Sequence, residues 1–235
     1  MDTVPKKVKR RRYDASGRRA TSAATRQRIL DAARDLILDN GYRATTVAAI
    51  ASSSDVNVDT VYELVGRKHM IVRELIEQAI SGTDRAVEAK DRDYVQAIRA
   101  ELDPAAKLAI YAGAVTRIQA RLAPLFGALR DAASTEPEAR KVWEEISERR
   151  AANMRAFVDD VRATGGLRPG LSAADAADTV WVTNSAEVYT LLTGERGWTP
   201  KRYERWLAAT WSWLLLGRAG ATSAQAASAG GRRRS

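Results

Sequence analysis

The chain has 235 residues, with no cysteine and a single histidine. Without cysteine it can form neither a disulfide framework nor a thiolate metal site, and one histidine is too few for a zinc cluster. We find no nucleophile paired with a base and no phosphate-binding glycine loop. We therefore expect no metal, no cofactor and no enzymatic activity.

Long apolar runs and alternating patterns are also missing. The longest apolar run, from Trp206 to Gly217, is too short to span a bilayer, and the basic N-terminus lacks the apolar segment of a signal peptide. We expect a cytoplasmic protein with no membrane partner. Since no run alternates with period two, the chain is predicted to be all-α.

The net charge of +9 is concentrated at the termini. Residues 1–28 hold ten Lys or Arg against two Asp, whereas residues 29–80 hold five against eight acidic residues. We interpret residues 1–21 as a disordered basic arm that contacts phosphates or the minor groove of DNA, or else as a solvated leader. Residues 218–235, rich in Ala, Ser and Gly before closing arginines, are predicted to be a flexible tail.

The segment from Thr45 to Lys68 predicts two short helices joined by a tight turn. Thr46 is a good N-cap for the first helix, and Asp55 tolerates the left-handed conformation that such a turn requires. Asn57 is placed to cap the second helix. Apolar spacing from about residue 25 to 40, ended by Gly41, predicts a third helix that covers the apolar side. Residues 22–67 are therefore expected to form a helix-turn-helix DNA-binding domain.

The runs TRQRILDAARDLILDNGYRATTVAAIA and DVNVDTVYELVGRKHMI resemble the N-terminal domain of the TetR family of one-component bacterial transcriptional regulators. The resemblance covers about residues 25–80. It departs from the family pattern at Asp55, where glycine is usual, at Asn57, where serine is usual, and at Val65, where phenylalanine is usual. The resemblance implies an all-α homodimer that binds DNA and leans toward repression.

Roles in DNA binding divide by chemistry. The first turn of a recognition helix reaches deepest into the groove, so its polar and exposed positions are our candidates for base contacts. These are Asn57, Val58, Asp59, Thr60 and Glu63. Thr46, Tyr62 and Lys68 are expected to contact phosphates, as the resemblance also implies. Arg43 and Arg67 flank the unit and fit either backbone contacts or solvated surface.

Residues 68–217 predict a larger helical domain for ligand binding and dimerisation. A fourth helix starting at Lys68 would belong to both domains. We expect capping boxes at Asp93 with Gln96 and at Thr135 with Glu138, and an interruption at Pro124.

The last two helices, at about 172–193 and 200–217, carry Trp, Tyr and Leu on more than one face. A homodimer through these helices would bury the excess and supply two recognition helices to a palindromic site.

Several polar or aromatic residues fall on or beside the apolar stripes of this domain, where a polar group must find a partner. They are Tyr111, Arg150, Trp181, Asn184 and Glu187. In one interpretation they orient a small-molecule effector in an apolar cavity. In the other they are satisfied polar groups of the core or the dimer interface.

The sequence thus predicts a nucleoid-associated transcriptional regulator, a repressor released from its operator by a small molecule that prefers one conformation. Two alternatives stay open: a DNA-binding protein that is controlled by a partner or acts architecturally, and a helical-bundle enzyme or carrier. The second alternative leaves residues 45–68 unexplained.

Overall fold

The computed structural model describes residues 15–217, with side chains from residue 19 onward. Regular structure in this part of the chain is entirely helical, as predicted. The elements, in order, are α1 (Ala15–Ala44), α2 (Val47–Ser53), α3 (Val58–Leu64), α4 (Lys68–Ser81), η1 (Ala89–Asp91), α5 (Asp93–Ala100), α6 (Pro104–Ala133), α7 (Pro137–Ala163), α8 (Ala173–Thr183), α9 (Ala186–Thr190), η2 (Leu191–Glu195), α10 (Pro200–Trp211) and η3 (Ser212–Leu216).

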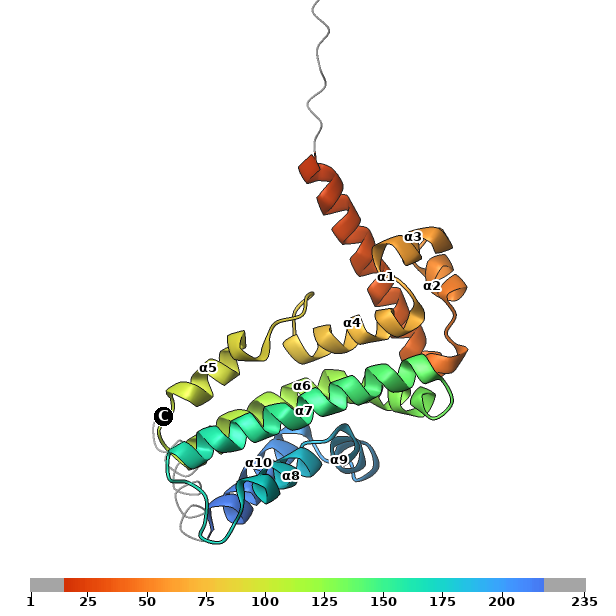
Figure 1. The fold of residues 1–235 in the computed structure, drawn as a ribbon. Coiled ribbons are helices and arrows are strands. Elements are labelled where there is room, and N and C mark those ends of the chain that lie inside the picture. The colour runs from red at the N-terminus through yellow and green to blue at the C-terminus, as the bar shows by residue number, and fades with distance from the viewer. Residues whose placement is uncertain (1–14, 218–235) are drawn as a thin grey trace, which may run out of the picture.

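The helices form a small unit and a larger body that share α4. Figure 1 shows α1 to α3 at one end, α4 lying between them and the long pair α6 and α7, and α8 to α10 on the far side of that pair. Helix α4 packs against α1 on one side and against α6 and α7 on the other. The predicted architecture, a helix-turn-helix unit joined by a shared helix to a helical body, is confirmed.

Helix α4 forms because its apolar residues recur at three- and four-residue spacing and Gly82 ends it. Ile71, Val72 and Ile76 are fully buried, and Gly82 adopts φ 73°, a left-handed conformation that glycine takes without a steric penalty. The helix begins at Lys68, where the sequence predicts its start.

Aromatic side chains fill the core of the larger body. The ring of Tyr111 lies 4.4 Å from that of Phe157 and 5.4 Å from that of Trp211, measured between centroids. Trp211 is fully buried and donates its indole N–H to Thr183 Oγ1 at 2.7 Å. Tyr203, also fully buried, donates to the Thr183 carbonyl. The last helix is therefore packed against α6 and joined to α8 by hydrogen bonds.

The predicted arm was wrong for residues 15–21, because α1 already begins at Ala15. Residues 19–21 are exposed, but alanine and arginine are good helix formers, and extending an existing helix requires no new nucleus. Residues 1–14 and the predicted tail at 218–235 lie outside the described residues.

The interruption predicted at Pro124 is also wrong, because α6 continues through it. A proline inside a helix removes one amide donor. Here its neighbours Ala123, Leu125 and Phe126 are all buried. Their packing keeps the helix continuous across the missing hydrogen bond.

Both predicted capping boxes of the larger domain are absent. Asp93 lies inside α5, and the Gln96 side chain donates to the Lys90 carbonyl instead. Helix α7 begins at Pro137 rather than at a Thr135 cap, since proline is favoured in the first turn. The Thr135 hydroxyl donates to the Ala132 carbonyl of α6.

The helix predicted over 172–193 is two helices. Ser172 caps α8 and accepts from the Asp175 amide at 3.1 Å. The run then breaks at Asn184, where the Ser185 side chain accepts from the Val188 amide and starts α9. A serine that caps a new helix competes with continuation of the old one.

The buried Lys107 provides a test of this fold. Its side chain is 2% exposed, and its ammonium lies 2.6 Å from Asp160 Oδ2 and 2.7 Å from the Ile98 carbonyl oxygen. Asp160→Asn removes the counter-charge and should lower the free energy of unfolding by about 3 kcal/mol, measured by urea denaturation.

The neighbouring Asp159→Asn is the matched control, because Asp159 pairs with Arg162 in solvent. It should change the stability by less than about 0.5 kcal/mol. Equal losses in the two variants would contradict the role given to the Lys107 pair.

Candidate nucleic-acid interface and enclosed cavity

The turn between α2 and α3 is set by local backbone geometry. Thr46 accepts from the Ala49 amide at 3.0 Å and starts α2, as predicted. Asp55 adopts φ 53°, the sole positive φ outside glycine in the described chain. The Val56 amide then donates back to the Ala51 carbonyl at 3.0 Å. Asn57 precedes α3 in the N-cap position, but its side chain makes no capping hydrogen bond.

Two helices of seven residues each are held by α1 and α4. Ile50 of α2 and Val61 of α3 are fully buried in a shared core. Arg26 of α1 donates to the Leu64 carbonyl at the end of α3 and forms an ion pair with Glu74 of α4 at 3.2 Å. The sequence analysis missed this role of Arg26, because the spacing between 26 and 64 carries no local signal.

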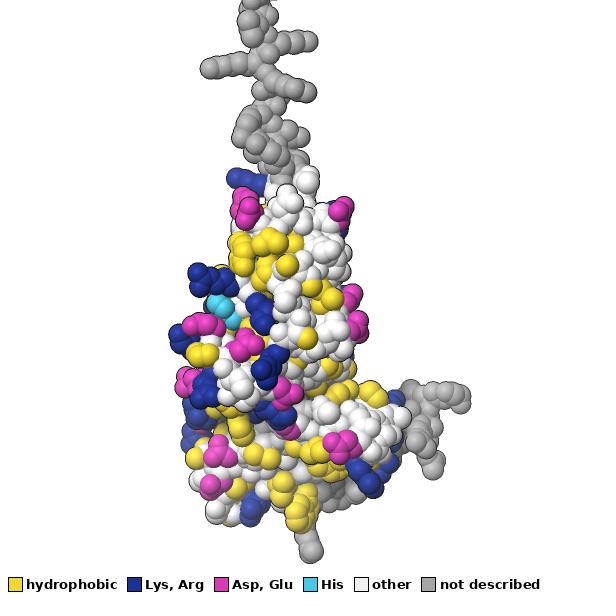
Figure 2. Space-filling view, turned by 90° about the vertical axis from the view of Figure 1, so that its right-hand side faces the viewer, with side chains coloured by type: hydrophobic (Ala, Val, Ile, Leu, Met, Phe, Trp, Pro, Cys, Tyr) yellow, Lys and Arg dark blue, Asp and Glu magenta, His cyan; other side chains and the backbone are white. Residues whose placement is uncertain are grey.

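The outer face of α3 is open to solvent. Val58 is 37% exposed and Tyr62 is 49% exposed, an unusual position for large apolar side chains. Figure 2 looks at this end of the molecule, where hydrophobic side chains gather in the upper part and Lys and Arg side chains lie around the single histidine. The remaining predicted DNA-binding residues of the unit are exposed or, for Thr60, half-buried: Arg43, Thr46, Asn57, Asp59, Thr60 and Glu63.

Lys68 differs from the other predicted phosphate contacts because it already has partners. Its ammonium donates to the Tyr42 carbonyl at 3.2 Å, lies 4.1 Å from the centroid of the Tyr42 ring and forms an ion pair with Glu136 at 3.7 Å. Burial, with Glu136 and Glu138 nearby, raises the pKa of the Tyr42 hydroxyl to about 12. Lys68 therefore joins the small unit to the start of α7.

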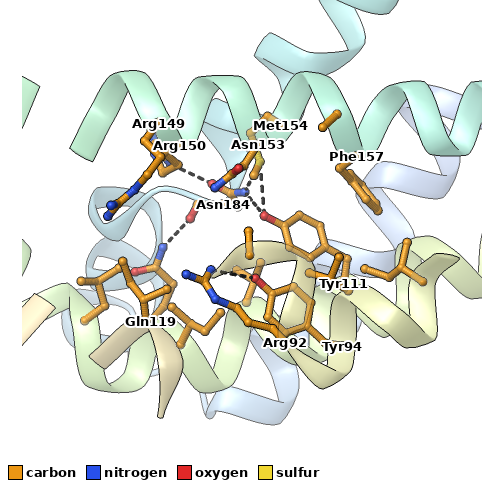
Figure 3. Close-up of a pocket in the computed structure, with 18 of the residues that line it drawn as sticks. Arg92, Tyr94, Tyr111, Gln119, Arg149, Arg150, Asn153, Met154, Phe157 and Asn184 are labelled. Atoms are coloured by element: carbon orange, nitrogen blue, oxygen red, sulfur yellow. Dashed lines mark hydrogen bonds between the residues drawn. The ribbon is translucent and has the colours of Figure 1, made fainter. Parts of the chain in front are cut away.

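The larger body contains a partly open cavity of about 210 Å³ lined mainly by residues of α4, α5, α6 and α7. Its wall is mostly apolar. Tyr111, Arg150 and Asn184, three of the predicted ligand residues, lie together on it (Figure 3). Trp181 and Glu187 are not on the wall: Trp181 lies under the Arg150 guanidinium, 4.4 Å from ring centroid to Cζ, and Glu187 pairs with Arg130 at 2.8 Å. The structure thus brings three of these residues together on the wall and places the other two outside it.

Asn184 is the centre of a polar network in the cavity wall. Its amide Nδ2 donates to the Tyr111 hydroxyl at 3.3 Å and to Met154 Sδ at 2.9 Å, and its Oδ1 accepts from Arg150 at 2.7 Å. Its backbone carbonyl accepts from Gln119 at 2.5 Å. Complete burial raises the pKa of the Tyr111 hydroxyl, and burial lowers the pKa of the Arg150 guanidinium.

Two wall residues were missed by the sequence analysis. Gln119 is buried on α6 among apolar residues, and that polar position in an apolar stripe was a signal that could have found it. Arg149 lines the cavity and forms an ion pair with Glu77 of α4. No pattern in the sequence indicates that α7, which carries Arg149, pairs with α4.

The described residues contain no group of three His, Cys, Asp or Glu side chains suited to holding a metal ion. No helix among the described residues is long and apolar enough to cross a membrane.

Asp55 provides a test of the turn. Asp55→Val should lower the free energy of unfolding by about 1–2 kcal/mol, because a β-branched residue is strained at positive φ. Asp55→Gly should stay within about 0.5 kcal/mol of the parent, since relief of the backbone offsets the entropy of glycine. Thermal unfolding of the two variants measures both values. A valine variant as stable as the parent would contradict the strain.

Comparison with known proteins places the small unit in a family. The family model described as bacterial regulatory proteins, tetR family, matches residues 29–66. An uncharacterized HTH-type transcriptional regulator, YvkB of Bacillus subtilis, is 36% identical over 69 residues, which are 29% of this chain and 36% of YvkB. The aligned part thus spans about a third of that regulator's length.

Solved structures share the fold over most of the chain. The regulator FadR of Bacillus subtilis, solved with stearoyl-CoA, has a TM-score of 0.63 and 20% identity, covering 81% of this chain and 98% of FadR. A regulator from Saccharomonospora viridis, solved with choline, has a TM-score of 0.58 and 19% identity, covering 79% and 94%. Residues 29–66 thus match the TetR family of bacterial regulatory proteins, and the chain as a whole shares the fold of TetR-family regulators of known structure.

Proposed function

We propose that the protein is a homodimeric repressor that binds a palindromic DNA operator and is released from it by a small molecule. The observation that carries this proposal is that α4 links an exposed α3 face to a cavity: it follows α3 after three residues and contributes Ile80 to the cavity wall. A DNA-binding protein with no effector would have no need of the cavity. The proposed repressor would act in the nucleoid.

In this proposal α3 enters the major groove. Its first turn, from Val58 to Thr60, faces base edges together with Asn57, while Tyr62 and Thr46 contact phosphates at the two sides of the groove. Arg43 adds a backbone contact. Lys68, held by Tyr42 and Glu136, would approach a phosphate only at the edge of the interface.

Dimerisation would use the surface of α8 to α10. Val182 is 52% exposed, Leu191 is 48% exposed and Trp213 is 60% exposed, so this surface carries large apolar side chains in solvent. An isologous dimer would bury them and present two copies of α3 to two half-sites.

Coupling between the cavity and α3 would pass through α4. Ile80 of α4 lies in the cavity wall, and Glu77 of α4 pairs with the wall residue Arg149. The relatives support a small-molecule effector but not its charge, since one was solved with stearoyl-CoA and another with choline.

Tyr62→Ala should weaken binding to every duplex by about tenfold, because a phosphate contact carries no sequence information. Thr60→Ala should instead change which duplexes are preferred. Selection from a random duplex library, followed by affinity measurements at fixed salt, separates these effects. Leu102→Ala is the control, since Leu102 is 81% exposed on the larger body. A change of preference in the Tyr62 variant alone would reverse the assigned roles.

Val182→Asp should convert the dimer to monomers, since it places a charge in the proposed apolar interface. Sedimentation equilibrium measures the change, and operator affinity should fall with it because one half-site is lost. Leu102→Asp, with the same charge at a more exposed leucine, should leave the dimer intact. A dimer that survives Val182→Asp would place the interface elsewhere.

A further inference from the structure

We propose that the cavity binds an anionic amphiphile: an apolar body between α5, α6 and α7, and an acid group at Arg150 with a hydrogen-bond donor beside it. Its role as effector rests on the proposed function, whereas its binding can be measured on the protein alone. The argument starts from the charges in the wall.

The charged side chains of the wall are mostly basic. It contains five cationic side chains, Lys90, Arg92, Arg99, Arg149 and Arg150, and a single acidic one, Asp160. Asp160 is already paired with Lys107 at 2.6 Å. The wall therefore has no free carboxylate to receive a cationic ligand, and an anion would meet an excess of positive charge.

Arg150 is a half-buried cation of this wall that forms no ion pair among the described residues, and Arg92 is a second one, bonded only to the Val87 carbonyl and the Tyr94 hydroxyl. Arg149 has Glu77, but Arg150 has only neutral partners: the Trp181 carbonyl, the Asn184 side chain and the Trp181 ring. A buried guanidinium without a carboxylate loses solvation that its neutral partners only partly replace. A ligand anion would supply the missing charge.

Two buried polar atoms of the wall have no hydrogen-bond partner, and they suit such a head group. They are the donor Arg150 Nε and the acceptor Gln119 Oε1. Gln119 cannot exchange its amide atoms without losing the bond from Nε2 to the Asn184 carbonyl. Both atoms are buried behind the surface of the wall, so a head group would reach them only after the two side chains shift. The free donor beside a positive charge would then suit an acid oxygen, and the free acceptor a hydroxyl or amide N–H.

Apolar and aromatic side chains lie on both sides of this polar group. Figure 3 shows Arg150, Asn184 and Gln119 toward one end, with Tyr111 and Phe157 toward the other, where Arg92 and Tyr94 also lie. On α6, Val115 lies between Tyr111 and Gln119, and Leu122 and Phe126 lie beyond Gln119. Burial of an aliphatic or aromatic body there contributes about 25 cal/mol for each Å² removed from water.

Titration calorimetry of the full-length protein with five eight-carbon probes tests the head group. The probes are octanoate, 3-hydroxyoctanoate, octyl phosphate, octanamide and octyltrimethylammonium. We expect octanoate to bind at least tenfold more tightly than octanamide, the cation not to bind, and 3-hydroxyoctanoate to bind several-fold more tightly than octanoate. The ratio of octanoate to octyl phosphate identifies the acid. Equal binding of octanoate and octanamide, or binding of the cation, overturns the proposal.

Asn184→Asp is the decisive variant, because it keeps the size of the side chain and gives Arg150 an internal counter-charge. It should abolish the preference for octanoate over octanamide while the thermal stability stays equal or rises. Arg150→Met should abolish the same preference, and Gln119→Leu should remove the gain from the 3-hydroxyl alone. Arg130→Gln, which changes an exposed arginine paired with Glu187, is the control and should leave all affinities unchanged.

Operator binding is measured separately, on a duplex selected by the protein without any probe. If the duplex binds but no anion is preferred, the proposed ligand class fails and the regulator stands. If anions bind as expected but do not release the duplex, the ligand class stands and the proposed release mechanism fails.

Discussion

Burial of α4 on both sides is the constraint on which the rest of the structure depends. Ile71, Val72 and Ile76 are fully buried, and each such side chain contributes about 1.5–3 kcal/mol relative to exposure. The ion pair of Arg73 with Glu145 links the same helix to α7 but lies in solvent, where such pairs contribute about 0–1 kcal/mol. Apolar packing therefore holds the two domains together, and the exposed charges mainly set how α4 lies against α7.

In the cavity wall, in contrast, hydrogen bonds between polar side chains hold the structure together. Asn184 satisfies Arg150, Gln119 and Tyr111 at once, so the three side chains hold one another in place without a ligand. The network is nevertheless incomplete at Arg150 Nε and Gln119 Oε1. Buried groups of this kind are costly unless a partner completes them. A frame held by hydrogen bonds, with two polar atoms left without a partner, is suited to selective binding.

Local signals explain which predictions succeeded. Gly82, Asp55 and the Thr46 cap each act within a few residues, so the ends of α2 and α4 could be predicted from the sequence. Pro124 was misjudged because packing from α6 neighbours outweighed its local effect, and the break at Asn184 was missed because Ser185 caps a new helix inside an apolar run. The group around the cavity could be predicted only in part, since Tyr111 lies on α6, Arg150 on α7 and Asn184 in the turn after α8, and the sequence has no signal for their meeting.

The length of α4 explains how a small change in the cavity could reach DNA. The helix has 14 residues, so it is roughly 21 Å long at 1.5 Å per residue. Its C-terminal end bears Ile80 and Glu77 at the cavity, and its N-terminal end follows α3 after three residues. A tilt of about 10° about one end would move the other by ~4 Å, comparable to the rise of one base pair, ~3.4 Å. In a dimer the two shifts act on both recognition helices, so a ligand that favours the tilted position needs no direct contact with the DNA-binding unit.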